Sequence, residues 1–306
     1  MPLFMEKVEK VITLDAHAKV NLTLEILGKR PDGYHALRSV VMPVTLCDTL
    51  RFTLRETPEI TMTTTLEPNV DGTHIGAPEK NLVIRMATLI QTRYGISSGV
   101  AIMLHKRIPI GGGLGGGSAD AAAVIRGLNQ LWNLNLSLSE MVELGAELGS
   151  DIPALVQGGA VLMEGRGEFV TPLFSGVSRE ECQGTWMIIA NPGVMCPTGE
   201  VFKKWSPDLT PPPFFLHNIH SSIRNSDVAA LATALFNGLQ RGVFENYPAV
   251  AKAAQALHNA GCFGVLLSGS GASVFGLVRD EQHGVEVSQR LQGNLWHVLA
   301  KTCPVV

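Results

Sequence analysis

The sequence predicts an α+β protein with two domains, the first of which contains an antiparallel sheet. Its length of 306 residues suits about two ordinary domains. A hydrophobic content of 45% with only 17% charged residues supplies enough apolar side chains for a packed core. The third observation is the order of the elements: segments of alternating apolar and polar residues precede a run of glycines that opens an amphipathic helix.

The strands expected in the first domain have a two-residue period. Apolar and polar residues alternate over residues 19–27, which predicts a half-buried strand whose polar face is solvated or meets a ligand. The Pro and Gly within residues 30–33 indicate a turn. Residues 49–54 and 59–65 alternate in the same way and predict an antiparallel sheet, to which residues 100–104 return as a strand.

Three helices are expected between residues 81 and 149 of the same domain. Asn81 is a plausible N-cap for the first, which has apolar residues on one side. The glycine run at residues 111–117 leads directly into the second helix. Ser137 and Glu140 form a capping-box pattern at the start of the third helix, which we expect to stop at Gly149.

The residue pattern changes at residues 164–168, which have the sequence EGRGE. We place a domain boundary there, between residues 1–166 and residues 167–306. No internal repeat is visible. The elements expected after the boundary are a strand at 187–190, a Pro-rich surface connection at 206–214, helices at 227–239 and 249–259, and a strand, glycine turn and strand at 265–275.

Charge and cysteine content argue against several classes of protein. A formal net charge of -3 gives no support for general binding to nucleic acid or to an anionic membrane. The five scattered cysteines include no C-x-x-C pair, so they indicate neither a disulfide framework nor a zinc cluster, and a reducing cytosol fits best. The charged first ten residues lack the apolar run of a secretory signal. We therefore expect a cytoplasmic protein that acts on a small molecule, and the choice between monomer and homodimer stays open.

Residues 109–118, with the sequence PIGGGLGGGS, are the strongest local signal. Six glycines in seven positions cost backbone entropy on folding, so the loop must need a close approach to its backbone or left-handed angles. Because the loop opens a helix, its free N–H groups lie at the positive end of the helix dipole and suit a phosphate. The alternative is a tight turn with nothing bound, for which two or three glycines would suffice.

Two other phosphate-binding patterns do not fit this loop. Gly111, Gly113 and Gly116 formally match the dinucleotide fingerprint G-x-G-x-x-G, but the strand–helix–strand start is missing, so an oxidoreductase is the least favoured reading. The Walker pattern fails because Ser118 follows the last glycine where that pattern requires Lys. Any lysine that reaches the terminal phosphates must come from elsewhere in the chain.

The loop resembles the second motif of the GHMP small-molecule kinases, a Pro-x-x-x-Gly-Leu-Gly-Ser-Ser-like segment that opens a helix. The four stretches that carry the resemblance, in the order of the family, are residues 18–22 with 28–35, residues 109–122, residues 149–153 with 165–168, and residues 268–271. The resemblance implies an ATP-binding, catalytic domain at 1–166, a ferredoxin-like, substrate-binding domain at 167–306, and a cleft between them. It also implies ATP-dependent phosphorylation of the 2-hydroxyl of 4-diphosphocytidyl-2-C-methyl-D-erythritol in the non-mevalonate isoprenoid pathway.

The same resemblance implies a catalytic pair, Lys19 and Asp151. In the family pattern the Asp receives or orients the proton of the acceptor hydroxyl, and the Lys holds charge as the phosphoryl group moves. From the residues alone, Asp151 is equally an N-cap for a helix that begins around Pro153. Mg2+ is expected as part of MgATP, with no protein ligand assigned.

Further residues match nucleotide and substrate positions of the family. Tyr34 and His35 are expected to stack on and hydrogen-bond a cytosine, although they could be an ordinary pair beside a turn. The other expected substrate residues are Asn21 on the polar strand face, and Thr198 and Phe202 from the second domain. The expected nucleotide residues are Asn81, Lys106, Pro109, Ile110, Gly111, Gly112, Gly113, Leu114, Gly115, Gly116, Gly117, Ser118 and Ala119. By themselves, Asn81 and Lys106 are a helix cap and a charge at a strand end. Ala119 departs from the second Ser of many relatives, which removes one hydroxyl from the loop.

Two alternatives to this function stay open at the level of sequence. One is another GHMP kinase, acting on mevalonate or homoserine, which needs no cytosine pocket; the segment from Asp32 to His35 argues against it. The other is a nucleotide sensor that has lost the chemistry, against which the presence of both Lys19 and Asp151 argues.

Overall fold

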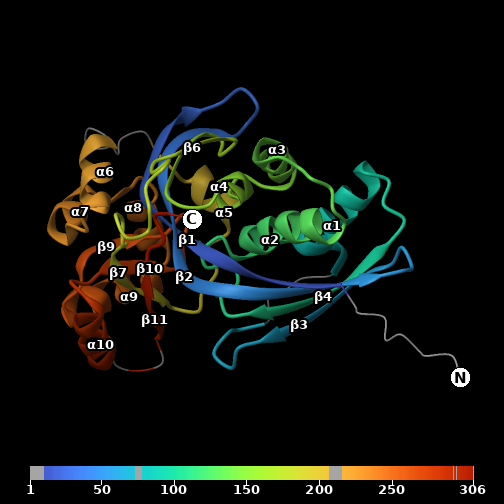
Figure 1. Cartoon of the computed structure of the whole chain (residues 1–306). Coiled ribbons are helices and arrows are strands. Elements are labelled where there is room, and N and C mark those ends of the chain that lie inside the picture. The colour runs from blue at the N-terminus through green and yellow to red at the C-terminus, as the bar shows by residue number, and fades with distance from the viewer. Residues whose placement is uncertain (1–9, 73–77, 207–215, 292, 294, 306) are drawn as a thin grey trace, which may run out of the picture.

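The computed structural model describes residues 10–72, 78–206, 216–291, 293 and 295–305, which form two β-sheets with helices packed on them (Figure 1). The strands of the first sheet are β1 (Val11–Lys29), β2 (His35–Arg55), β3 (Ile60–Leu66), β4 (Gly99–Lys106), β5 (Val161–Gly165), β6 (Phe169–Pro172) and β8 (Phe236–Asn237). The strands of the second sheet are β7 (Trp186–Asn191), β9 (Phe263–Leu267), β10 (Val274–Leu277) and β11 (Trp296–Lys301). The predicted α+β fold class is confirmed.

The first sheet has the strand order β3-β4-β2-β1-β8, and β5 pairs with both β2 and β6. Most neighbours are antiparallel, as predicted, but β3 runs parallel to β4 and β8 runs parallel to β1. The sheet is therefore mixed rather than antiparallel throughout. The cause is helix α1 (Leu82–Arg93), which lies between β3 and β4 in the chain, because a strand–helix–strand crossover joins parallel strands.

Helices α1, α2 (Gly116–Leu131), α3 (Leu138–Leu148) and α4 (Ile152–Gln157) gather on one side of the first sheet (Figure 1). Helix α2 packs directly on β1 and β2. The side chain of Asn81 accepts a hydrogen bond from the Val83 N–H at 2.9 Å, so the predicted cap of α1 is confirmed. The predicted capping box of Ser137 and Glu140 is present, and α3 ends at Gly149 as expected.

Residues 18–26 of strand β1 are buried on both faces. Apolar residues on one face share a core with Met187 and Phe275 of the second sheet. The polar residues on the other face, alternating from Lys19 to Glu25, are only 2–3% exposed. The expected strand is confirmed, but the expectation that only half of it is buried is wrong. A two-residue period reports which residues share a face, and it cannot report which distant segments pack on the polar face.

The second sheet has the order β11-β7-β10-β9, and all its neighbours are antiparallel. Helices α9 (Pro248–Ala260) and α10 (Glu281–Arg290) pack against it. A four-stranded antiparallel sheet with two helices agrees with the expected ferredoxin-like domain. Helix α9 confirms the helix predicted at 249–259, and β9 and β10 confirm the strand, turn and strand predicted at 265–275.

The remaining described helices are the short 3-10 helix η1 (Pro78–Lys80), α5 (Thr198–Lys203), α6 (Leu216–Arg224), α7 (Val228–Ala234) and α8 (Gln240–Asn246). The helix predicted at 227–239 is too long, because α7 ends at Ala234 and β8 follows. Asn237 stabilises this break: its side-chain amide donates to the carbonyls of Leu267 and Gly269 at 2.9 and 2.8 Å. The apolar spacing runs on through the break, so periodicity did not reveal it.

The predicted domain boundary at residue 166 falls in the turn between β5 and β6. This hairpin keeps the chain in the first sheet as far as Pro172, and β8 returns to that sheet from the C-terminal half. The division into residues 1–166 and 167–306 stays a proposal. The predicted Pro-rich connection lies outside the described residues, apart from Ser206.

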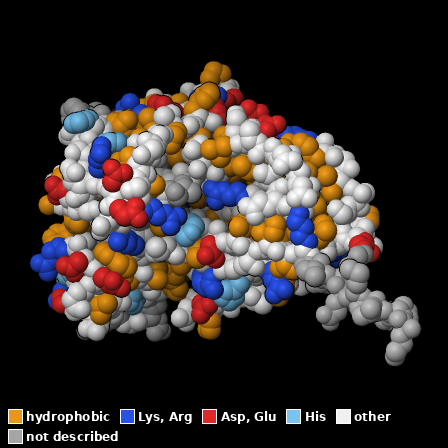
Figure 2. Space-filling view, viewed as in Figure 1, with side chains coloured by type: hydrophobic (Ala, Val, Ile, Leu, Met, Phe, Trp, Pro, Cys, Tyr) orange, Lys and Arg blue, Asp and Glu red, His pale blue; other side chains and the backbone are white. Residues whose placement is uncertain are grey.

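The described surface carries charges of both signs. Acidic and basic side chains are interspersed over the face in view in Figure 2, in line with the formal net charge of -3. Among the described helices, none has both the length and the apolar character that crossing a membrane requires.

Candidate functional site

A cavity of about 810 Å³ is lined by residues from both halves of the chain. Its volume lies within the roughly 300–1,000 Å³ that is typical of small-molecule sites. The wall includes Lys19 and Asn21 from β1, Asp151 from the start of α4, most of the glycine-rich loop, and the turn at 269–271. The structure thus brings together segments that are far apart in the sequence.

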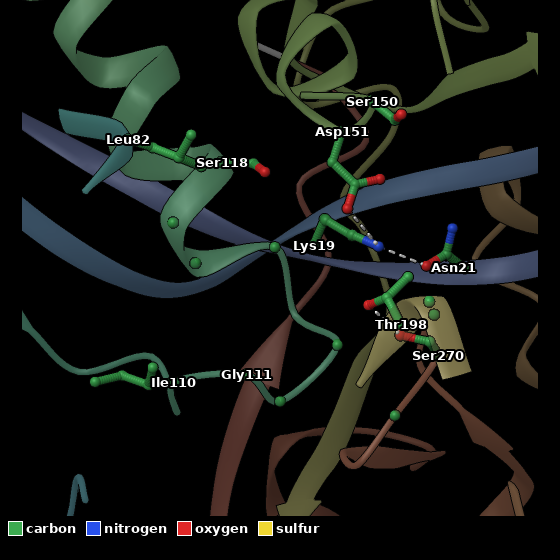
Figure 3. A pocket seen from close by; sticks show the side chains of 18 of the residues that line it. Lys19, Asn21, Leu82, Ile110, Gly111, Ser118, Ser150, Asp151, Thr198 and Ser270 are labelled. Atoms are coloured by element: carbon green, nitrogen blue, oxygen red, sulfur yellow. Dashed lines mark hydrogen bonds and ion pairs between the residues drawn. The ribbon is translucent and has the colours of Figure 1, made fainter. Parts of the chain in front are cut away.

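Lys19, Asn21 and Asp151 point toward one another at the centre of this cavity (Figure 3). The Lys19 Nζ atom donates to Asn21 Oδ1 at 2.7 Å and lies 3.4 Å from Asp151 Oδ2. Lys19 is 3% exposed, whereas the Asp151 side chain is 33% exposed and faces the open cavity. A buried ammonium beside an accessible carboxylate suits the transfer of a charged group to a hydroxyl.

Asp151 occupies the N-cap position of α4, yet its side chain makes no capping hydrogen bond. The structural role that the sequence allowed for this side chain is therefore absent, and its carboxylate is directed to Lys19 instead. Pro153 lies in the first turn of α4, as predicted. On the other side of the pair, the Lys19 backbone N–H donates to the Leu114 carbonyl at 2.9 Å, which ties β1 to the glycine-rich loop.

The glycine-rich loop packs against the turn at 268–273 of the second sheet. The Ser273 N–H donates to the Gly112 carbonyl at 2.9 Å, and Ser268 Oγ donates to the Gly113 carbonyl at 3.1 Å. Gly113 has a φ of +75°, and an added Cβ would overlap the Ser268 carbonyl and lie 2.7 Å from the Gly271 carbonyl oxygen. The sequence predicted a close approach to the loop backbone. At Gly113 the approaching atoms are backbone atoms of the protein's own turn at 268–271.

The other end of the loop opens into the cavity. Gly116, Gly117 and Ser118 form the first turn of α2, whose N-cap is Gly115. No side chain caps this helix, and its first turn contains no acidic residue. The N–H groups of the turn are therefore left to a ligand, and the positive end of the helix dipole favours an anion.

Not every residue of the predicted loop reaches the cavity. Pro109, Ile110 and the six glycines line it together with Ser118, but Leu114 and Ala119 do not. Leu114 is fully buried in the core beside the second sheet, and Ala119 is 2% exposed in the core under α2. The backbone of these two residues shapes the loop, and their side chains belong to the cores.

One end of the cavity contains aromatic rings from both halves of the chain. His35 and Phe202 both line it, and their ring centroids are 5.4 Å apart. The Trp205 ring lies 5.7 Å from His35 but does not line the cavity. Burial, with a smaller contribution from nearby Lys29, lowers the pKa of His35, which favours the neutral ring. A neutral imidazole offers one donor and one acceptor, which suits a polar heterocycle.

Tyr34 and Thr198 complete this end of the cavity. Tyr34 is 53% exposed, and the guanidinium of Arg166 lies 5.4 Å from the centroid of its ring. Thr198 Oγ1 is 3.0 Å from Ser270 Oγ, which connects α5 to the glycine turn. The sequence reasoning gave no role to Arg166 or Trp205. Arg166 could have been noticed in the EGRGE segment, whereas nothing local marks Trp205.

Asn81 and Lys106 line the opposite end of the cavity, beyond the start of α2. Asn81 caps α1, as described above, and its neighbours Lys80 and Leu82 also face the cavity. Lys106 is not a solvated charge at a strand end: it is 6% exposed and forms ion pairs with Asp48 and Asp120. Within the described residues, no group of three His, Cys, Asp or Glu side chains is placed to hold a metal ion.

Comparison with known proteins adds an independent line of observation. The chain matches the model of the GHMP kinase N-terminal domain over residues 81–159 and that of the GHMP kinase C-terminal domain over residues 219–296. A 4-diphosphocytidyl-2-C-methyl-D-erythritol kinase of Pelotomaculum thermopropionicum is 38% identical, over 92% of this chain and 93% of its own. The protein of the same name from Gloeobacter violaceus is 38% identical, over 93% of this chain and 91% of its own.

Solved structures share the fold over nearly the whole chain. The crystal structure of a 4-(cytidine 5'-diphospho)-2C-methyl-D-erythritol kinase has a TM-score of 0.77 at 29% identity, covering 95% of this chain and 99% of its own. Mevalonate kinase of L. major, in complex with R-mevalonate, has a TM-score of 0.70 at 14% identity, covering 98% and 99%. Homoserine kinase of Cytophaga hutchinsonii has a TM-score of 0.65 at 17% identity, covering 99% and 98%. At these lower identities the likeness concerns the fold alone.

Proposed function

The chain belongs to the GHMP kinases, and within them to the 4-diphosphocytidyl-2-C-methyl-D-erythritol kinases, and on this premise we propose that it phosphorylates the 2-hydroxyl of 4-diphosphocytidyl-2-C-methyl-D-erythritol with ATP. The observation that carries the proposal is the Lys19–Asp151 pair at 3.4 Å, which lies between the first turn of α2 and the aromatic end of the same cavity. This arrangement supports a reaction in which the phosphate donor, the reacting pair and the acceptor are lined up in one cavity.

In the proposed reaction the first turn of α2 holds the triphosphate through its free N–H groups. The acceptor oxygen attacks the γ-phosphorus while the bond from that phosphorus to the β,γ-bridging oxygen breaks, and ADP leaves. Asp151 accepts or orients the proton of the acceptor hydroxyl, and Lys19 offsets the negative charge on the moving phosphoryl group. Asn21 fixes the Lys19 ammonium by accepting its hydrogen bond at 2.7 Å.

We propose that ATP enters as its magnesium complex. The phosphates of ATP and water would supply most of the ligands of the ion, as is usual for Mg2+. Within the described residues, no group of three His, Cys, Asp or Glu side chains is placed to hold a metal by itself. The five cysteines are all free in the structure, which supports a reducing compartment, and we propose the cytoplasm.

The proposal is tested by turnover of the purified protein with ATP and three separate acceptors. We expect phosphorylation of 4-diphosphocytidyl-2-C-methyl-D-erythritol, and no detectable phosphorylation of mevalonate or homoserine. Transfer to either of the latter without transfer to the cytidine compound would make the substrate assignment wrong. Nucleotide binding without transfer to any acceptor would support the sensor alternative.

We propose that Arg166 recognises the diphosphate of the acceptor. Its guanidinium lies over the Tyr34 ring, on the wall of the cavity beside the aromatic end. Arginine binds phosphate oxygens through paired N–H groups, and packing on an aromatic face holds it in place at low entropic cost. Lys203 lines the same region and adds a second positive charge.

Arg166→Gln is expected to weaken binding of the cytidine diphosphate acceptor about tenfold, since one charge-assisted contact is lost. Inhibition by CDP should weaken by a similar factor, whereas inhibition by cytidine, which has no phosphate, should not change. Lys204→Gln is the matched control, because Lys204 Nζ bonds Asn246 Oδ1 at 2.8 Å outside the cavity. An equal loss for CDP and cytidine would contradict the assignment.

A further inference from the structure

Three buried charges lie at the base of the glycine-rich loop and have no role in the reaction described above. Lys106, at the end of β4, is 6% exposed, Asp48 in β2 is fully buried, and Asp120 in α2 is 3% exposed. The Lys106 Nζ atom donates to Asp120 Oδ2 at 2.8 Å and makes a second, short hydrogen bond to Asp48 Oδ2. Such a cluster is costly to bury unless its charges are paired and hydrogen-bonded.

The cluster joins the two ends of the loop. Asp48 Oδ1 accepts hydrogen bonds from the N–H groups of Arg107 and Ile108 at 2.5 and 2.9 Å, directly before the loop begins at Pro109. Asp120 lies in the second turn of α2, just after the loop ends. Lys106 bridges these carboxylates, so one set of contacts fixes the chain where it goes into the loop and where it leaves it.

The cluster also reaches the cavity. Lys106 and Asp120 both line it, and an added Cβ at Gly116 would lie 3.4 Å from Lys106 Nζ. Asp120 Oδ1 is buried and has no hydrogen-bond partner within the described residues. Two of the three ammonium N–H groups of Lys106 are used by the carboxylates, which leaves one donor. One acceptor and one donor therefore remain beside the nucleotide end of the cavity.

Two carboxylates and one ammonium carry a net charge of about -1 when all are ionised. Burial raises the pKa of Asp120 to about 7; Asp48 adds to this effect, and Lys106 opposes it. For Lys106 burial acts to lower the pKa, but the two carboxylates outweigh it and raise the pKa, so the ammonium stays charged. Protonation of Asp120 makes the cluster neutral, and a neutral cluster does not repel a triphosphate.

We propose that Asp48 and Asp120 are positioning residues for the nucleotide, which act through Lys106 to hold both ends of the glycine-rich loop in the form that binds ATP. The inference rests on the proposed function only in taking the nucleotide as the ligand of this loop. Neither carboxylate touches the reacting atoms. Their effect is therefore on the affinity for the nucleotide and not on the chemical step.

The test compares Asp120→Ala and Asp120→Asn with the wild-type protein. Measurements are the dissociation constant of a non-hydrolysable ATP analogue without acceptor, the KM for each substrate, and kcat. We expect Asp120→Ala to weaken analogue binding and raise the KM for ATP by about tenfold, with the KM for the acceptor and kcat within about twofold. Asp120→Asn keeps an acceptor for Lys106 and should restore binding to within about threefold of wild type.

A pH series supplies a readout that a purely structural role would not move. Analogue binding to the wild type should weaken as the pH rises through about 7, where Asp120 loses its proton, and the Asp120→Asn profile should lack this component. The free nucleotide titrates in the same way in both experiments. The difference between the two pH profiles therefore reports the contribution of Asp120 to binding. The charged groups facing Asp120 are Lys106 and Asp48, and Lys19, Lys80 and Asp151 lie elsewhere on the cavity wall.

Glu147→Gln is the control, since it removes an exposed ion pair with Arg93 on helices α1 and α3. Unchanged analogue affinity in Asp120→Ala, or an equal loss in both KM values and kcat, would overturn the proposal. If Asp120→Ala does not fold, a wild-type pH profile in Asp120→Asn overturns it equally. Because analogue binding is measured without acceptor, failure of the acceptor assay would count against the proposed function and leave this result intact.

Discussion

Asp151→Asn is expected to lower kcat by about a thousandfold while the affinity for nucleotide stays within about twofold, since a positioned acid–base group contributes roughly 10²–10⁴ to the rate. The amide keeps the shape of the side chain but can neither accept the proton of the acceptor hydroxyl nor pair with the Lys19 ammonium at 3.4 Å. The nucleotide is held by the first turn of α2, which the substitution does not alter.

The structure makes this variant a clean test, because the Asp151 side chain makes no capping hydrogen bond to α4. The midpoint of thermal unfolding should therefore stay within about 2 °C of wild type, the small shift expected when no stabilising contact with the helix is lost. Single-turnover kinetics separate the chemical step from binding. A wild-type rate in this variant would falsify the catalytic assignment, and a large drop in unfolding temperature would show that the side chain acts on stability instead.

The sequence predicted best where a signal is local. The capping box at Ser137, the cap at Asn81 and the stop at Gly149 each depend on contacts within a few residues, and all three are present. The glycine-rich loop was recognised for the same reason, because its composition has a high backbone cost that only a close approach explains.

The sequence predicted less well where the determining contact comes from a distant segment. The direction of β3 depends on the crossover through α1. The burial of Lys19 and Asn21 on the polar face of β1 depends on contacts with distant residues such as Asp151. Lys106 was assigned to the nucleotide, but Asp48, which is 58 positions away in the chain, received no role. Asp120 lies in the stretch 109–122 that resembles the family, yet no role was predicted for it, since nothing in a linear sequence marks a carboxylate as buried beside a lysine.

Gly113→Ala is expected to have the largest effect on stability among substitutions in the glycine-rich loop. Its φ of +75° is unfavourable for alanine, and the new methyl group would overlap the Ser268 carbonyl of the second sheet. These are backbone atoms, which cannot rotate away as a flexible side chain could. We expect a loss of about 3 kcal/mol or more in the free energy of unfolding, measured by urea denaturation.

Gly117→Ala provides the matched comparison within the same loop. Gly117 lies in the first turn of α2, and the atom nearest to an added Cβ is Leu82 Cδ1 at 3.7 Å, an ordinary contact. Alanine there should leave stability unchanged or raise it by up to about 1 kcal/mol, because it favours the helix. The methyl group would project at the cavity wall where the triphosphate is proposed to approach the backbone, so the KM for ATP should rise about tenfold. If both variants lost stability and nucleotide affinity in the same proportion, the loop would have a single role. If Gly113→Ala mainly lowers stability and Gly117→Ala mainly raises the KM for ATP, the loop has two separate roles, packing on the second sheet and binding phosphate.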